Sequence, residues 1–193
     1  LLNAVGLVAL GTIADVVPLL GENRILTKYG LSALQYTEIP GLRALLDIAD
    51  LSNTNLDAFH VGYRLGPRLN APGRVGKAGI VVEMLTTTCS ERAVEIANFL
   101  DQENKRRQDI QVDIMASARK KVMNEINLDE TTAIVLADQA WHPGIIGIIA
   151  SKIVEEFNRP TVMIAIAADI GHGSARSIPS FHILEALEYC KSK

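Results

Sequence analysis

Three short segments of the sequence combine arginine, hydroxyl and imidazole side chains with glycine or proline. The first, RLGPRLNAPGR at residues 64–74, places Arg64, Arg68, Asn70 and Arg74 within eleven residues. Arginine pairs with two phosphate oxygens at once, and glycine lets a backbone approach an anion closely. We therefore expect a phosphate-binding turn here. The alternative is an ordinary loop whose arginines pair with nearby acids.

The second segment is Trp141-His142-Pro143-Gly144, between an apolar run and an isoleucine-rich run. Pro143 suits the first turn of a helix, so the segment should join a strand to a helix N-terminus. Anions are favoured there because the first N–H groups of a helix point outward. Phosphate contact through His142 is one interpretation, and a simple turn with Trp141 packed as a lid is the other.

The third segment, GHGSARS at residues 171–177, alternates like a strand. Its alternation places His172, Ser174 and Arg176 on one face, which the glycines keep open. An imidazole, a hydroxyl and a guanidinium on a common face suit a terminal phosphate monoester. The glycines lack a Walker lysine and the spacing of a dinucleotide-binding loop, so neither of those sites is indicated.

A single carboxylate, Asp15, stands in the apolar segment GTIADVVPL at residues 11–19. An unpaired carboxylate in apolar surroundings is costly, so Asp15 should meet a cation, a metal ion or several N–H donors. The residues alone favour an aspartate that caps a helix or forms a turn over a metal ligand.

Turn signals divide the chain into elements that could position these segments. Short helices are predicted at 2–14, 24–35, 41–49, 55–65 and 78–85. Neither Gly nor Pro occurs from Ser90 to about Ile126, which predicts one long helix. Its middle, residues 101–109, is polar on every face, so we expect it to bridge two domains through solvent, aided by an Asp101–Lys105 pair.

The pattern changes to strand, helix and strand after residue 127. Apolar runs at 133–137 and 162–167 predict parallel strands covered on both faces, with a helix at 144–157 between them. A strand near 172–178 and a helix from about Phe181 follow. The predicted fold class is α/β, with a helical first part and a β-α-β unit in the second.

Composition restricts the class of protein. The 193 residues are 48% hydrophobic and 21% charged, and the net charge of −3 gives no general attraction to polyanions, so any nucleic-acid binding must be local. Cys89 and Cys190 stand far apart, no apolar run is long enough for a membrane span, and no signal peptide is indicated; we expect a cytoplasmic protein. The start at Leu1 rather than Met suggests a fragment of a longer chain.

Five segments in this order and spacing, GTIADVVPL, RLNAPGR, the long helix, WHPGIIGIIASKI and GSARS, resemble the RecJ exonucleases of the DHH phosphoesterase superfamily. The resemblance implies a 5′→3′ single-strand-specific DNA exonuclease of DNA repair and recombination, which hydrolyses phosphodiesters with two Mn²⁺ or Mg²⁺ ions. It also implies the C-terminal part of a DHH domain at 1–88, a connector helix at 89–126 and the start of a DHH-associated domain at 127–193.

The resemblance assigns roles to seven residues: metal ligand for Asp15, contact to DNA backbone phosphates for Arg68, Asn70, Arg74 and His142, and contact to the 5′-terminal phosphate for Ser174 and Arg176. Single-stranded DNA is the implied partner. The family's Asp-rich and DHH segments, which hold the other metal ligands, are absent from this sequence, so we expect the isolated chain to be inactive. Two alternatives remain: a DHH phosphoesterase for very short oligonucleotides or 3′-phosphoadenosine 5′-phosphate, whose relatives show a GGGH-type cluster, and a non-catalytic phosphate- or nucleotide-binding module.

Overall fold

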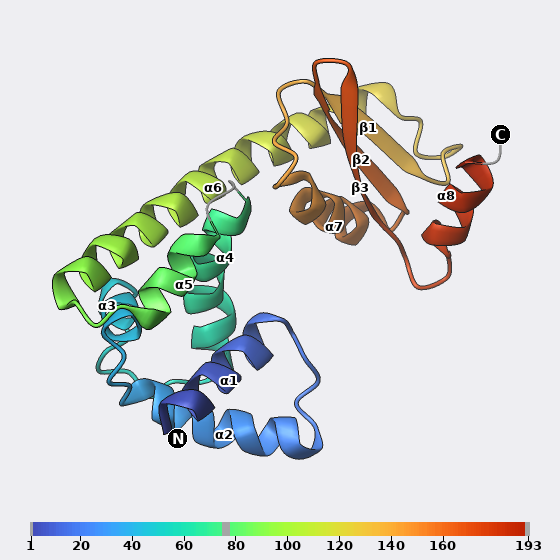
Figure 1. Ribbon diagram of the computed structural model, residues 1–193. Helices are drawn as coiled ribbons and strands as arrows, with labels where there is room; N and C mark the ends of the chain where they lie inside the picture. Colours follow the sequence, from blue (N-terminus) through green and yellow to red (C-terminus); the bar gives the residue numbers. More distant parts are fainter. Residues whose placement is uncertain (1, 75–77, 192–193) are drawn as a thin grey trace. The chain divides into compact units, whose positions relative to one another are not determined.

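A computed structural model describes residues 2–74 and 78–191, which form two compact units, 1–106 and 107–193 (Figure 1). The first unit is helical: α1 (Leu2–Ala14), α2 (Gly21–Gln35), α3 (Pro40–Ile48), a π-helix (His60–Leu65), α4 (Gly66–Arg74) and α5 (Gly79–Thr86). The long α6 (Ser90–Glu125) begins in the first unit and continues into the second. The second unit adds β1 (Ile134–Asp138), α7 (Ile146–Phe157), β2 (Thr161–Ala167), β3 (Ile170–Arg176) and α8 (Ile183–Lys191).

The first unit packs its helices around leucines that are fully excluded from solvent. Leu34 of α2, Leu45 of α3 and Leu100 of α6 each have no exposed surface and belong to one core cluster. Helix α1 lies directly against α2 because Gly30 has no side chain: a Cβ there would collide with the carbonyl oxygen of Val5. The first half of α6 is therefore part of this core.

The second unit is a three-stranded sheet in the order β1-β2-β3. Strands β1 and β2 are parallel and joined through α7, as predicted, whereas β3 is antiparallel to β2. One face of the sheet packs against α7 and the second half of α6, and buries Leu136 and Met163. The opposite face is partly open, since Val135 is 60% exposed. The prediction that the strands are covered on both faces is therefore wrong for the described chain; their apolar residues alternate between a buried and a partly exposed face.

The predicted long helix is present as α6, without a break from Ser90 to Glu125. The prediction that its middle is solvated on every side is wrong, because Asp101 and Asn104 are only 9% and 3% exposed. Asp101 contacts Arg68 of α4, and Asn104 is likewise buried. The predicted pair of Asp101 and Lys105 is confirmed, with 2.8 Å between Oδ2 and Nζ.

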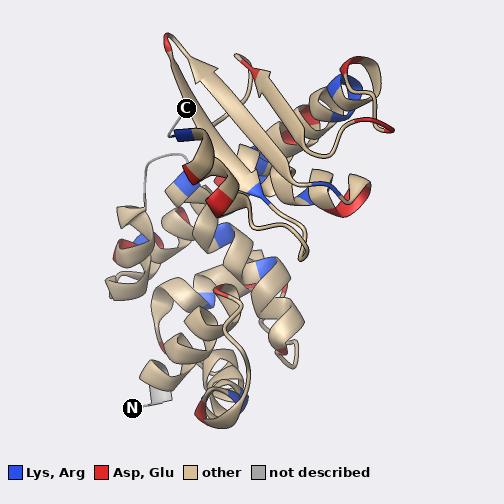
Figure 2. Cartoon of the chain, turned by 90° about the vertical axis from the view of Figure 1, so that its right-hand side faces the viewer, with Lys and Arg blue, Asp and Glu red and all other residues tan. Residues whose placement is uncertain are grey.

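Basic and acidic positions are interspersed along the elements (Figure 2). Within the described ranges, no helix is both long and apolar enough to span a membrane. Because the net charge is −3, a phosphate ligand would have to be recognised by a local group of donors and not by a general positive field.

Candidate phosphate-binding site

Side chains of β3 lie over the first turn of α7. Ser174 is paired across the sheet with Met163, and Arg176 with Thr161, and both partners are fully buried. Residues paired across two strands share a face of the sheet, so Ser174 and Arg176 point toward the face that α7 covers. A Cβ placed on Gly147 of α7 would lie 2.9 Å from Oγ of Ser174 and 3.2 Å from Nη2 of Arg176. The structure thus brings together the two residues predicted to bind the terminal phosphate.

These side chains remain accessible beside the helix start. Ser174 is half-buried, Arg176 is exposed, and Nη1 of Arg176 lies 3.3 Å from Oγ of Ser174. The beginning of a helix carries a partial positive charge, while the first N–H groups of α7 already donate to a carbonyl oxygen of the preceding turn. A hydroxyl, a guanidinium and a helix start in contact with one another form a suitable environment for a phosphate group. Gly147 supplies space, a contribution the sequence interpretation did not assign to any residue.

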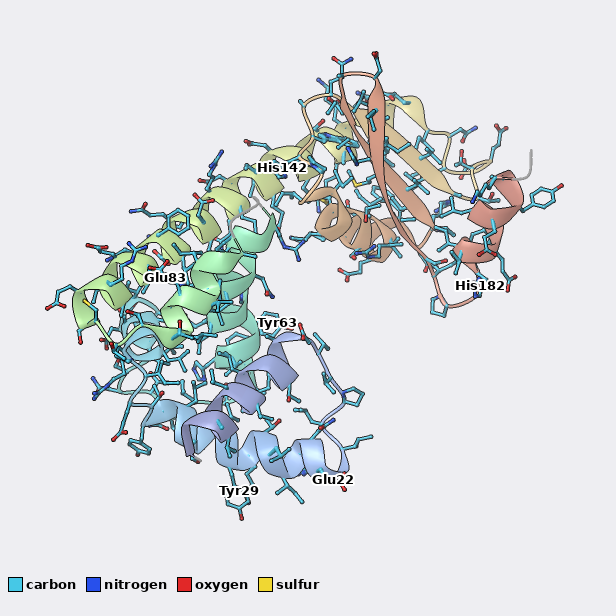
Figure 3. All side chains as sticks on the ribbon, in the orientation of Figure 1. Glu22, Tyr29, Tyr63, Glu83, His142 and His182 are labelled. Atoms are coloured by element: carbon cyan, nitrogen blue, oxygen red, sulfur yellow. The ribbon has the colours of Figure 1, made fainter. Side chains whose placement is uncertain are left out.

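His142, which is labelled in Figure 3, caps the turn that leads into α7. Its carbonyl oxygen accepts hydrogen bonds from the N–H groups of Ile145 and Ile146, and its Nδ1 accepts one from Gly144 at 3.1 Å. An accepting Nδ1 places the ring proton of a neutral imidazole on Nε2. The helix begins at Ile146, two residues later than predicted, because a turn at residues 143–145 precedes it.

Trp141 anchors this loop. The residue is 4% exposed within the core of the second unit, and its Nε1 donates to Oγ of Ser117 on α6 at 3.2 Å. The interpretation of Trp141 as a packed side chain is therefore confirmed. It is compatible with a phosphate contact by His142, which is only half-buried.

The segment predicted as a phosphate-binding turn is instead helical, because α4 spans Gly66–Arg74. Pro67 lies where α4 follows the preceding π-helix, and its missing N–H removes one internal hydrogen bond there. Pro72 removes one internal hydrogen bond, a cost offset by burial of its ring and of Ala71. The helix also continues directly from the π-helix His60–Leu65, so its first turn needs no separate nucleation.

Helical geometry divides the predicted phosphate contacts between two faces of α4. Asn70 and Arg74 are four residues apart and both are exposed, so they lie side by side. Arg68 faces another way: its side chain is 16% exposed and its Nε lies 2.9 Å from Oδ1 of Asp101 on α6. The expectation of one loop that presents all these residues together is wrong. The partner of Arg68 was missed because it lies 33 residues away in sequence.

The neighbours of Asp101 lower the pKa of its carboxyl group. Burial raises the pKa of its carboxyl group, but the hydrogen bond from Lys105 and the positive charge and hydrogen bond of Arg68 together outweigh burial, so the pKa lies below its ordinary value. The pair of Arg68 and Asp101 is therefore a charged contact throughout the neutral range.

Asp15 lies in the turn that follows α1. It is exposed and its N–H donates to the carbonyl oxygen of Gly11 at 3.0 Å. The expected apolar surroundings are not present in the described chain, since the adjacent Val16 is 85% exposed. Among the described residues, no group of three or more His, Cys, Asp or Glu side chains is positioned to hold a metal ion. One exposed carboxylate does not form a metal centre by itself.

Comparisons with known proteins show which family the chain resembles. Residues 129–192 match the family model of the DHHA1 domain. Across 189 residues, 96% of its length, the chain is 41% identical to the single-stranded-DNA-specific exonuclease RecJ of Bacillus subtilis. The chain is RecJ-like along almost its whole length. Its identity to the RecJ of Escherichia coli is 40% over 188 residues. The resemblance inferred from the five segments is confirmed.

Solved structures confirm the α/β fold class of the RecJ-like chain. RecJ from Thermus thermophilus in complex with Mg²⁺ superposes with a TM-score of 0.86 at 34% identity and covers 99% of the chain. A RecJ bound to manganese gives a TM-score of 0.81 and covers 97%. The chain covers 29% and 46% of those two structures, and 24% and 32% of the B. subtilis and E. coli proteins. It thus spans about a quarter to a third of the curated relatives.

Proposed function

We propose that this chain is part of a 5′→3′ single-strand-specific DNA exonuclease that hydrolyses phosphodiester bonds in DNA repair and recombination. The observation that carries the proposal is the 41% identity along 96% of the chain to an exonuclease named for this specificity. Single-stranded DNA in the cytoplasm is the proposed substrate. The positions of Ser174 and Arg176 support the proposal, because they form a group suited to a phosphate end.

Ser174 and Arg176 hold the 5′-terminal phosphate in this proposal. A phosphate monoester carries more negative charge than an internal diester, so it gains more from a guanidinium beside a helix start. Oγ of Ser174 donates one hydrogen bond, and Arg176 neutralises charge and donates others. Because Gly147 has no Cβ, both side chains can lie close to the first turn of α7.

The remaining candidate contacts bind internal phosphates. Asn70 and Arg74 offer donors from the exposed side of α4. Arg68 makes its two protein contacts through Nε and Nη1, so Nη2 is the nitrogen that would donate to a phosphate. His142 would donate through Nε2, because its Nδ1 accepts a hydrogen bond from Gly144. Contacts of this kind position a strand without reading its sequence, so they suit an enzyme that degrades any single strand.

Mn²⁺ or Mg²⁺ is the proposed cofactor of the complete enzyme, with Asp15 as a carboxylate ligand that this chain contributes. Carboxylate oxygen suits both ions. Bound divalent ions supply a hydroxide nucleophile and stabilise the displacement at phosphorus. Because the described residues do not form a metal centre, no bond-breaking step is assigned to them; their proposed work is to bind and orient the strand.

The test uses the complete protein that contains this chain, with strands bearing either a 5′-phosphate or a 5′-hydroxyl. The wild type should shorten single strands from the phosphorylated end and leave duplex DNA intact, and Arg176→Ala should abolish the preference for the phosphate. Arg119→Ala is the matched control, because this exposed arginine of the same unit pairs with Glu156 at the surface. Release of product only from dinucleotides would contradict the proposed activity. An unchanged preference in Arg176→Ala would contradict the proposed end site.

A further inference from the structure

Arg68 is held in a fixed orientation by two contacts. Its Nε donates to Oδ1 of Asp101 at 2.9 Å, and its Nη1 donates to the backbone oxygen of Arg64 at 2.6 Å. Because a guanidinium is planar, two bonds from two different nitrogens fix both its position and its plane. The third nitrogen, Nη2, donates to no acceptor within the described part of the chain, so the direction of its two N–H bonds is set by the other contacts.

Asp101 is itself constrained. Its side chain is 12% exposed, and its second oxygen, Oδ2, lies 2.8 Å from Nζ of Lys105 one turn later on α6. Each carboxylate oxygen therefore has its own cation, and rotation of the carboxylate would break both pairs. The orientation of Arg68 is thus fixed by a residue of α6, a helix of 36 residues, and not by a surface loop.

We propose that Asp101 is a positioning residue for DNA binding, which holds Arg68 so that Nη2 points at a backbone phosphate. This inference rests on the proposed function, in which Arg68 contacts DNA. The negative charge of a carboxylate offsets part of the positive charge of the arginine beside it, and this weakens the electrostatic attraction of the arginine to DNA. The pair favours binding because an arginine with a fixed donor direction loses less conformational freedom when it meets its phosphate.

The direction in which one substitution changes the Kd for single-stranded DNA distinguishes a positioning role from an effect of charge alone. Asp101→Asn keeps the shape of the side chain and removes one negative charge, so charge alone predicts tighter binding of single-stranded DNA. Positioning predicts the opposite, because the amide holds Arg68 weakly and places an NH₂ donor against Lys105. We expect the Kd and KM for single strands to rise about tenfold, the effect of weakening one charge-assisted hydrogen bond, with kcat unchanged.

Asp109→Asn is the matched control. It is the same substitution on the same helix, at an exposed aspartate with no ion pair among the described residues. It should leave the Kd unchanged or lower it slightly. Lys105→Met removes the other partner of Asp101 without touching Arg68, and it should raise the Kd less than Asp101→Asn does.

A double variant shows whether Asp101 acts through Arg68. Arg68→Ala should weaken binding, and Asp101→Asn should add no further weakening in that background. The complete protein is used throughout, with a fluorescent oligonucleotide for the Kd and a single-strand digestion assay for KM and kcat. If the Asp101→Asn variant unfolds at the assay temperature, Arg68→Lys is used in its place. Lysine can still pair with Asp101 but has one nitrogen and not three, so the Kd should rise while the protein stays folded.

The outcomes distinguish this inference from the proposed function. A wild-type protein that neither binds nor digests single strands would contradict the proposed function. An active wild type whose Asp101→Asn variant binds DNA as tightly as wild type, or more tightly, would overturn the positioning role. So would a loss of affinity that persists in full in the Arg68→Ala background, or an Arg68→Lys variant with wild-type affinity.

Discussion

Gly147→Ala in the complete protein tests the terminal-phosphate site without removing any group that would touch DNA. The added Cβ would lie 2.9 Å from Oγ of Ser174 and 3.2 Å from Nη2 of Arg176, closer than ordinary van der Waals contact. Both atoms end side chains that can rotate away at little cost. Alanine also favours a helix over glycine by about 1 kcal/mol. The free energy of unfolding should therefore change by less than about 1 kcal/mol.

Binding should change far more than stability. Displaced donors at Ser174 and Arg176 no longer meet the phosphate, and a hydrogen bond to a charged group contributes about 1.5–3 kcal/mol. The ratio of kcat/KM for 5′-phosphorylated over 5′-hydroxyl strands should fall about ten- to a hundredfold. Gly79→Ala is the control, because a Cβ at that helical position meets no atom within 4 Å. A full preference for the phosphate in Gly147→Ala, at an unchanged Tm, would refute the assignment of the site.

Four further predictions concern stability and activity. Trp141→Phe removes the hydrogen bond to Ser117 and should lower the free energy of unfolding by about 1 kcal/mol, measured in urea. Leu45→Ala, at a fully buried position, should cost about 2–5 kcal/mol in the same assay. The hydrogen bond from the N–H of His60 lowers the pKa of Asp57 below its usual 3.8. The stability that Asp57 contributes is therefore present above pH 3.8 and is lost as the pH falls through the lower folded pKa. Asp57→Asn should remove this loss of stability, as measured by the Tm at a series of acidic pH values. The isolated 193-residue chain should show no Mn²⁺-dependent digestion of single strands, and robust digestion would count against a metal centre that needs other ligands.

Elements that depend on local pattern were predicted well. Helix α6 follows from a run without Gly or Pro that begins at a serine, and its predicted bounds agree with Ser90–Glu125 within one residue. The parallel pair β1 and β2 follows from two apolar runs with a helix between them. In these cases the spacing of apolar residues and the absence of helix breakers determine the element, and neither requires knowledge of distant contacts.

Features that depend on distant contacts were not predictable. The prolines of residues 66–74 indicate a turn when considered locally, but burial of Ala71 and Pro72 stabilises a helix there. The apolar neighbours of Asp15 suggest a buried carboxylate, although burial depends on what packs against the segment and not on its own composition. Asp101 reads as a partner of Lys105 alone, since only the fold brings Arg68 to its other oxygen.

The two candidate phosphate-binding groups differ in whether the positive charge of their arginine is paired with a carboxylate. Arg176 forms no ion pair within the described residues and lies beside the start of α7, so it keeps its full charge. Arg68 forms an ion pair with Asp101, and the direction of its Nη2 is fixed by its other contacts. A strongly charged end group is best held by the first arrangement, whereas a diester of single charge gains mainly from direction. In the proposed exonuclease, internal diesters must move along the site as the strand shortens, so a partly neutralised arginine of fixed direction suits them better than a fully charged one.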